Sequence, residues 1–145
     1  MIRVGDGKDS AVTIEILKDK ADIYCYIINS RGATNATVEI VQLTKRTIYA
    51  KRTLDKKMLE LNKKWYLNGH TPFSAIMAFS SIIAAYLNGL KFIALSKESS
   101  ANESTIKDSY INPQYSKSYE FEKDYRYYES TLVNSGVYYF SFEGQ

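Results

Sequence analysis

The chain has 145 residues, of which 45% are hydrophobic and 24% charged, with a net charge of +3. This is the size and composition of one soluble globular domain, and it excludes a disordered or fibrous chain. The absence of a long apolar run and of a signal-peptide pattern predicts a cytoplasmic protein, while a single cysteine and a single histidine exclude an internal disulfide and a zinc-type ligand set.

The N-terminal segments alternate between strand and helix patterns. The apolar run 1–4 predicts a short buried strand that enters a glycine turn. Apolar residues then recur at three-and-four spacing over 11–17, which predicts an amphipathic helix that ends near residues 18–20. The β-rich run 22–28 predicts a second strand, in which we interpret Cys25 as a buried residue rather than a nucleophile.

A second helix and a third strand follow a polar break. The helix is predicted to start with Thr34 or Asn35 as its cap and to continue towards Thr44. Residues 47–50 predict a short strand. The order of elements so far is therefore strand, helix, strand, helix, strand.

The positive charge is concentrated in one stretch. Eight of the 19 basic residues fall between Lys45 and Lys64, and the rest of the chain is mildly acidic. Residues 54–64 are predicted to be helical, with Met58 and Leu61 facing inward, the lysines facing outward and Trp65 packed. We interpret the stretch as solvated surface, with a contact to RNA or polyphosphate as the alternative.

The clearest predicted helix runs from Phe73 to about Leu87. Thr71 can cap its first amides, and Pro72 suits the first helical position. The helix is apolar nearly all round, which predicts that it is buried. Asn88 and Gly89 supply a left-handed stop, and residues 90–95 predict an interior strand.

The last third of the chain adds a polar loop, a helix and a strand. Residues 96–109 form a polar loop after a buried strand, where open α/β sheets bind ligands. Residues 115–129 mix tyrosines with charges and are predicted to be helical, and residues 137–142 predict a strand. The alternation predicts a single α/β domain over residues 1–145, with three layers and a mainly parallel sheet that has helices on both faces.

The turn from Gly5 to Ser10 lies between the first strand and the first helix. Two glycines let backbone amides converge there and the helix N-terminus adds positive potential, which suits an anion such as pyrophosphate. Lys8 can add a charge, Ser10 can donate or cap, and Asp9 can accept from amides or hold Mg²⁺ through water. An ordinary tight turn capped by Asp9 is the alternative that spacing alone leaves open.

This turn is similar to the Ser-Gly-Gly-x-Asp-Ser signature of PP-loop ATP pyrophosphatases, with Gly5 in place of the serine and Asp6 in place of a glycine. In that family the loop holds the pyrophosphate end of ATP while a substrate oxygen attacks the α-phosphate. The resemblance implies a Rossmann-like fold of the PP-loop/HUP type, with ATP and Mg²⁺ as cofactors and Asp9 at the metal. The implied cofactor-binding residues are Gly5, Gly7, Lys8, Asp9 and Ser10.

Three later segments, residues 68–72, 98–103 and 114–122, resemble in order and spacing the bacterial UDP-MurNAc-L-alanyl-L-glutamate epimerases. These enzymes use ATP to activate the terminal glutamate carboxylate, invert its α-carbon and release AMP and pyrophosphate. The resemblance covers nearly the whole chain. Because the enzymes of this family are much longer, it implies that residues 1–145 are the nucleotide-binding core of a larger enzyme.

Epimerisation needs a base that removes the α-proton and a group that returns a proton to the other face. The resemblance and their positions at element ends make His70, Glu98 and Glu103 the catalytic candidates. The alternative is that His70 only precedes a helix cap and that the glutamates are solvated loop charges. The residues expected to bind carboxylate or phosphate groups of the substrate are Asn102, Lys117 and Ser118.

The leading hypothesis is thus an ATP-dependent, carboxylate-adenylating enzyme core that acts on a nucleotide-sugar peptide in peptidoglycan precursor synthesis. Another PP-loop chemistry, such as amidation or thiolation of a nucleobase or tRNA, is the first alternative, and the lysine-rich stretch favours it. A non-catalytic nucleotide-binding or oligomerising remnant is the second, and it is favoured by Asp6, Ser99 and Pro113, which depart from the family pattern. Neither a membrane nor a nucleic acid is expected as a partner under the leading hypothesis, and a homo-oligomer stays open.

Overall fold

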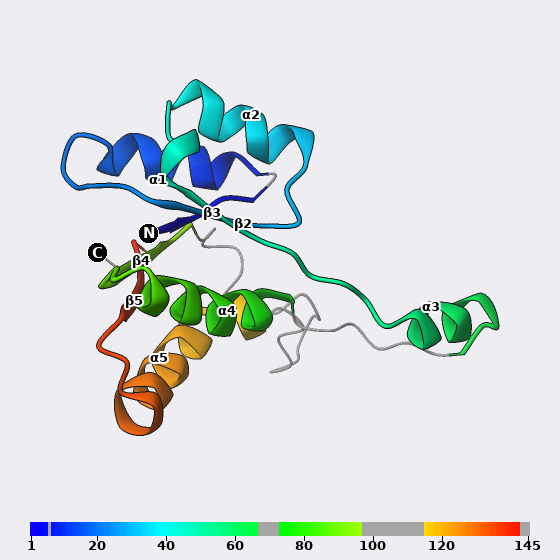
Figure 1. Ribbon diagram of the computed structural model, residues 1–145. Helices are drawn as coiled ribbons and strands as arrows, with labels where there is room; N and C mark the ends of the chain where they lie inside the picture. Colours follow the sequence, from blue (N-terminus) through cyan, green and yellow to red (C-terminus); the bar gives the residue numbers. More distant parts are fainter. Residues whose placement is uncertain (6, 67–72, 97–114, 143–145) are drawn as a thin grey trace, which may run out of the picture.

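The computed structural model describes residues 1–5, 7–66, 73–96 and 115–142 (Figure 1). The strands are β1 (Ile2–Arg3), β2 (Cys25–Ile28), β3 (Thr47–Ala50), β4 (Phe92–Leu95) and β5 (Tyr138–Ser141). The helices are α1 (Lys8–Leu17), α2 (Gly32–Ile40), α3 (Lys56–Lys63), α4 (Phe73–Leu87) and α5 (Tyr119–Tyr128). Short helical turns lie at η1 (Thr44–Arg46), η3 (Tyr115–Lys117) and η4 (Glu129–Val133).

The strands of the described residues form one parallel sheet in the order β3-β2-β1-β4-β5. Ile2 of β1 lies opposite Cys25 of β2 on one side and Ala94 of β4 on the other. The chain therefore builds the sheet outward from β1 to β3 and then returns to place β4 against the other side of β1. In open parallel sheets, ligands bind outside the carboxyl ends of the strands where the order reverses in this way.

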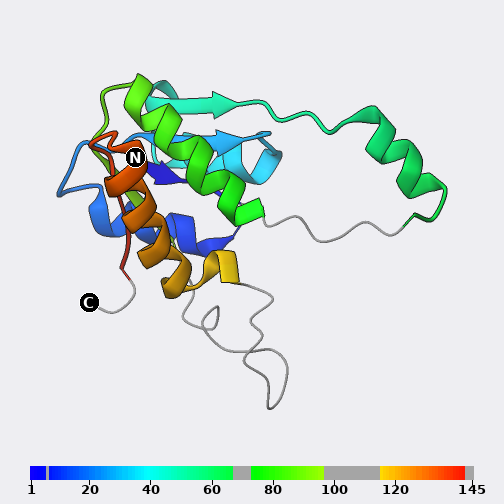
Figure 2. The same ribbon diagram turned by 90° about the horizontal axis from the view of Figure 1, so that it is seen from below.

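Helices cover both faces of the sheet (Figures 1 and 2). On one face, Ile14 of α1 and Val38 of α2 are fully buried against Ile2 and Ile27. Successive side chains of a strand point to opposite faces, so Ile2 joins this core while Arg3 lies on the other face. The predicted three-layer α/β fold with a parallel sheet is confirmed.

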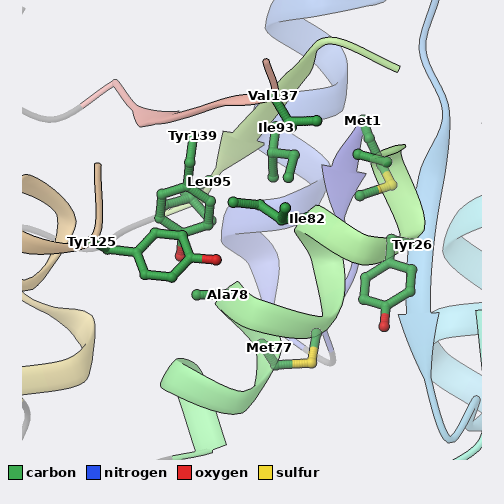
Figure 3. Packing of buried hydrophobic residues seen from close by; sticks show 11 residues of the cluster. Met1, Tyr26, Met77, Ala78, Ile82, Ile93, Leu95, Tyr125, Val137 and Tyr139 are labelled. Carbon is green, nitrogen blue, oxygen red and sulfur yellow. The ribbon is translucent and has the colours of Figure 1, made fainter. Parts of the chain in front are cut away.

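The core on the opposite face is built from α4, α5 and the sheet side chains that face them, and it extends from Tyr139 of β5 to Tyr26 of β2 (Figure 3). Ile82 of α4 and Tyr125 of α5 pack there with Ile93 and Tyr139, and the rings of Tyr125 and Tyr139 meet edge to face with their centroids 4.9 Å apart. Aromatic pairs favour this arrangement. This core packs α4 against the sheet, and α4 forms one wall of the candidate site.

Two predicted boundaries were wrong. The strand predicted over 22–28 is regular only over Cys25–Ile28. The helix predicted to be capped by Thr34 or Asn35 starts earlier, because Thr34 lies in the first turn. Its hydroxyl accepts a hydrogen bond from the Arg31 amide and donates one to the Arg31 carbonyl, both at 2.9 Å. Thr34 thereby stabilises the first turn of α2 by bonding to the backbone of its N-cap residue, Arg31.

Two predictions of packing were also wrong. The helix α3 extends away from the body of the domain (Figure 1), so that Leu61 is exposed and Trp65 is 93% exposed rather than packed. The helix α4 is buried on one side only, since Ile83 and Tyr86 on its outer side are more than half exposed. An apolar pattern indicates which side chains can pack, but it does not show whether another element covers them.

None of the described helices is both long and apolar enough to cross a membrane.

Alkaline pH is expected to destabilise the fold. Burial raises the pKa of the Cys25 thiol from about 9 to about 11 and is the main reason that the pKa of Tyr139 rises from about 10 to about 12. Both groups lose their protons more readily in the unfolded chain, so their stabilising contribution is complete below pH 9 and is lost as pH rises towards 12. Urea unfolding at pH 8 and pH 10.5 should show a lower midpoint at the higher pH, with a smaller fall in Cys25→Ala. A midpoint that rises with pH would contradict the assignment.

Candidate functional site

A cleft of about 530 Å³ opens at the carboxyl ends of β1, β2 and β3. Its walls come from the segments after β1, β2 and β3, from Ser96 and from α4. The described lining residues are Arg3, Val4, Gly5, Gly7, Asp9, Ser10, Ile28, Asn29, Arg31, Thr34, Arg52, Leu54, Phe73, Met77 and Ser96. Ser96 follows β4, and its hydroxyl donates to the Thr13 hydroxyl of α1 at 2.8 Å, which ties the end of β4 to the helix that follows β1. The cleft therefore lies where the strand order reverses, and it has the volume of a small-ligand site.

The turn between β1 and α1 is held by Ser10. This serine is 4% exposed, and its hydroxyl lies within hydrogen-bonding distance of the carbonyl oxygens of Gly7 (3.1 Å) and Gly5 (3.3 Å). Gly7 is the N-cap residue of α1, and no side chain among the described residues caps it. The alternative that Asp9 caps a tight turn is thus not what the structure shows. The first amides of α1 remain suited to an anion at the cleft.

The two glycines of the turn are not required by the fold. A Cβ on Gly5 would meet nothing within 4 Å, and one on Gly7 would meet only the Asp9 carboxylate at 3.9 Å. Neither residue has a positive φ, whereas Gly89 and Gly136 do. Because larger residues would fit here, the absence of side chains leaves space for a ligand to approach the backbone.

Three arginines and a single aspartate line the cleft: Arg3, Arg31, Arg52 and Asp9. Arg3 is half-buried, and its Nε is a buried atom without a hydrogen-bond partner in the described part of the chain. Arg3 and Arg52 form no ion pair with any described residue. A buried polar atom without a partner is uncommon, and three arginines against one aspartate give the described lining of the cleft an excess of positive charge.

Arg52 is positioned by Asn29, which directly follows β2. The Arg52 amide donates to Asn29 Oδ1 at 2.7 Å, and Asn29 Nδ2 donates to the Arg52 carbonyl at 2.9 Å. The guanidinium of Arg52 lies over the ring of Phe73, 5.2 Å from its centroid. These contacts hold Arg52 at the α4 wall of the cleft.

The structure brings together most of the predicted loop residues. Gly5, Gly7, Asp9 and Ser10 line the cleft, while Lys8 is exposed at the start of α1 and does not line it. Ser118 is buried as the N-cap of α5, where its hydroxyl accepts from the Phe121 amide at 3.2 Å and donates to the Tyr115 carbonyl at 2.8 Å. Lys117 ends η3. The predicted residues that lie outside the described residues are His70, Glu98, Asn102 and Glu103.

The arginines and Asn29 were missed by the sequence reasoning. Arg3 carries a usable signal, because it is a charged residue inside the apolar run 1–4 of a predicted central strand. Arg52 carries none, since it lies in a stretch rich in basic residues. No group of three or more His, Cys, Asp or Glu that could hold a metal occurs within the described ranges. The role of Asp9 at Mg²⁺ stays a prediction.

Comparisons with known proteins match the chain to one family. The protein-family model described as the MurL N-terminal domain matches residues 1–142 of the chain. The chain is 36% identical over 124 residues to UDP-N-acetyl-alpha-D-muramoyl-L-alanyl-L-glutamate epimerase of Salinispora tropica, covering 82% of this chain and 26% of that protein. It is 32% identical over 144 residues to the protein of the same name from Xanthomonas oryzae pv. oryzae, covering 97% and 32%. The chain thus spans between a quarter and a third of these relatives, and no solved structure matches it.

Proposed function

The chain belongs to the MurL N-terminal domain family, and from this premise we propose that it is the nucleotide-binding core of a larger, ATP-dependent epimerase. The substrate of the proposed reaction is UDP-MurNAc-L-Ala-L-Glu, whose terminal L-Glu is inverted in peptidoglycan precursor synthesis. The relatives named as epimerases of this compound support the substrate class.

The observation that carries the proposal is Arg3, whose Nε has no hydrogen-bond partner and which pairs with no carboxylate among the described residues, beside a turn whose glycines leave the backbone open. In the proposed complex, the amides between Gly5 and Ser10 bind the pyrophosphate end of ATP, and Arg3 supplies a half-buried positive charge beneath it. Ser10 holds the turn by its bonds to Gly5 and Gly7. The half-buried carboxylate of Asp9 fits a water-mediated contact to Mg²⁺ at the same end of the cleft. This assignment makes the turn a PP-loop.

The proposed chemistry needs ATP because the α-proton beside a free carboxylate is too weakly acidic to remove. Bound ATP would supply the adenylyl group, because a carboxylate oxygen would displace pyrophosphate from the α-phosphate. The resulting mixed anhydride would withdraw electron density from the α-carbon until water cleaves it and AMP leaves. While the anhydride is present, a base of the protein takes the proton, and a second group returns one to the other face. We propose His70, Glu98 and Glu103 for these roles, and Asn102, Lys117 and Ser118 for binding the substrate.

Gly7→Val tests the phosphate loop. Because the Gly7 backbone is extended and has room for a side chain, we expect the fold to be kept, with a loss of no more than about 1 kcal/mol in the free energy of unfolding because valine is a poorer N-cap than glycine. The valine fills the space over the amides, so the affinity for ATP, measured by calorimetry, should fall at least tenfold. Ala11→Val, an exposed position one turn into α1 and outside the cleft, is the matched control. An unchanged ATP affinity in Gly7→Val would count against the loop.

A second candidate is a PP-loop enzyme that acts on tRNA. The lysines of α3 favour this second candidate. They are exposed on a helix that lies away from the body of the domain, and such a basic surface attracts a phosphate backbone. Pyrophosphate release that depends on UDP-MurNAc-L-Ala-L-Glu supports the epimerase, and release that depends on tRNA supports this second candidate. ATP binding without turnover on either substrate indicates a non-catalytic remnant.

A further inference from the structure

The cleft has two basic ends that lie on different strands. Arg3 is part of β1, Arg52 follows β3, and β2 separates these strands. Neighbouring strands are about 4.8 Å apart, so the backbones of the two ends are roughly 10 Å apart. The contact with Phe73 keeps the Arg52 guanidinium at the α4 wall. A pyrophosphate group bound over the turn between β1 and α1 therefore leaves Arg52 available to a different group.

Several contacts hold the Arg52 end of the cleft in a defined conformation. Asn29 has a left-handed backbone with φ 50°, a conformation that asparagine tolerates better than most residues. It fixes the Arg52 backbone through both a donated and an accepted hydrogen bond. Three elements, β2, β3 and α4, thus position one guanidinium. A side chain held in this way loses less conformational entropy when a ligand binds.

The chemistry around Arg52 combines a charge with an apolar surface. Its guanidinium has no carboxylate partner within the described ranges of the chain. Beside it, Leu54 is 44% and Phe73 43% exposed, and both line the cleft. A guanidinium matches the oxygens of a phosphate, and an apolar surface suits a planar base. A nucleoside diphosphate carries both groups.

We propose that this end of the cleft is a second subsite, which binds the nucleoside diphosphate of a nucleotide-sugar substrate while the turn after β1 binds ATP. Arg52 contacts the diphosphate, Leu54 and Phe73 contact the base, and Asn29 is a positioning residue for Arg52. The inference rests on the proposed function, because that function requires a nucleotide-sugar and ATP in the same cleft. It places the two anions at opposite ends of the cleft.

Calorimetry on the 145-residue chain tests the subsite, with UDP as the probe in the presence and absence of saturating ATP. Arg52→Met should weaken UDP binding about 10- to 100-fold, the effect of losing a hydrogen-bonded charge contact, and should change ATP affinity less than about twofold. Asn29→Ala should weaken UDP binding in the same direction. Lys51→Met removes the same charge from an exposed neighbour outside the cleft and should change neither affinity.

The outcomes separate this inference from the proposed function. Gly7→Val should show the reverse pattern, with ATP binding lost and UDP binding kept. UDP that competes with ATP, UDP binding that is insensitive to Arg52→Met, or an equal loss of ATP affinity in that variant would overturn the second subsite. Wild-type chain that binds ATP but not UDP overturns the subsite alone. If the chain binds UDP through Arg52 but does not bind ATP, the second subsite is supported and the proposed phosphate loop is overturned. If it binds neither nucleotide, both proposals are overturned.

Discussion

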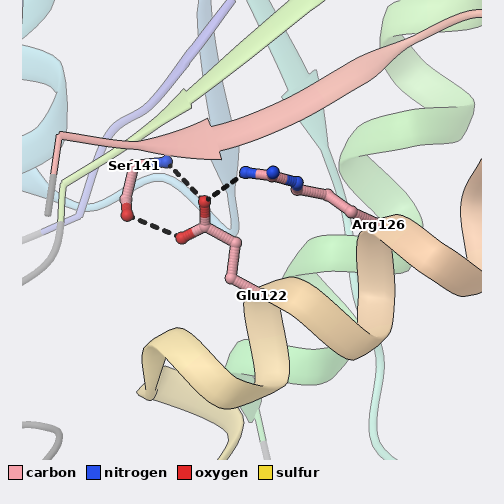
Figure 4. Close-up of polar contacts among 3 residues, drawn as sticks. All are labelled: Glu122, Arg126 and Ser141. Carbon is pink, nitrogen blue, oxygen red and sulfur yellow. Dashed lines mark hydrogen bonds and ion pairs between the residues drawn. The ribbon is translucent and has the colours of Figure 1, made fainter. Parts of the chain in front are cut away.

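Glu122→Ala is expected to lower the free energy of unfolding by about 3 to 5 kcal/mol, a large share of the 5 to 15 kcal/mol typical of a domain. Glu122 lies on α5, is 1% exposed and faces the edge strand β5 (Figure 4). Its Oε1 accepts from the Ser141 amide at 3.0 Å, and its Oε2 accepts from the Ser141 hydroxyl at 2.6 Å. Arg126 Nη1 lies 3.4 Å from Oε1.

The cost arises mainly from Ser141. Without the carboxylate, the buried amide and hydroxyl of Ser141 lose their acceptor, and each hydrogen bond to a charged group contributes about 1.5 to 3 kcal/mol. Arg126 is about one third exposed, so water takes over much of its lost ion pair and it adds less. The variant therefore weakens the contact between β5 and α5, and it does not leave Arg126 as a buried charge without a partner.

Two further variants make this expectation sharp. Glu122→Gln keeps the volume and one acceptor for the Ser141 amide, so we expect a loss of about 1 to 2 kcal/mol. Glu120→Ala, on the exposed side of the same helix, should stay within about 0.5 kcal/mol of the wild type. Urea unfolding at pH 7 measures all three. A loss below 1 kcal/mol in Glu122→Ala would show that the contact does not hold β5.

The sequence was sufficient to predict the layers but not which surfaces meet. Short apolar runs, three-and-four spacing and helix caps are local signals, and they predicted strands near β1 to β5 and the long helix α4. The outward position of α3 and the exposed side of α4 depend on which elements lie next to them. Local patterns carry no such information, so Leu61 and Trp65 were placed in the interior by mistake.

The candidate site was predictable only where its residues are adjacent in sequence. The turn from Gly5 to Ser10 is contiguous, and its glycines and serine could be identified as a possible anion site. The pair of Asn29 and Arg52 is 23 residues apart and forms only because β2 and β3 are neighbours in register. The Glu122–Ser141 contact, 19 residues apart, depends in the same way on α5 crossing β5. Such pairs need the strand order, which the sequence alone did not provide.

Arg3→Met separates function from stability at the centre of the sheet. Arg3 ends the central strand, has an unpartnered Nε within the described part of the chain and lies beside Tyr139, whose pKa it holds lower than burial alone would. A methionine of similar length removes the cost of keeping a half-buried charge but also removes the hydrogen bond between Arg3 and Tyr139. Because these effects oppose each other, the free energy of unfolding should change by less than about 1 kcal/mol.

ATP binding should respond very differently in the same variant. If Arg3 is the charge beneath the pyrophosphate end of ATP, its removal should weaken ATP binding about 100-fold, which corresponds to roughly 3 kcal/mol. Arg3→Lys keeps the charge without the planar fork and should recover part of the affinity. Arg46→Met is the control, because Arg46 pairs with Asp22 outside the cleft. If Arg3→Met instead lowered stability by several kcal/mol and left ATP affinity unchanged, Arg3 would be a structural partner of Tyr139, and the cleft would lose the observation on which its assignment to ATP depends.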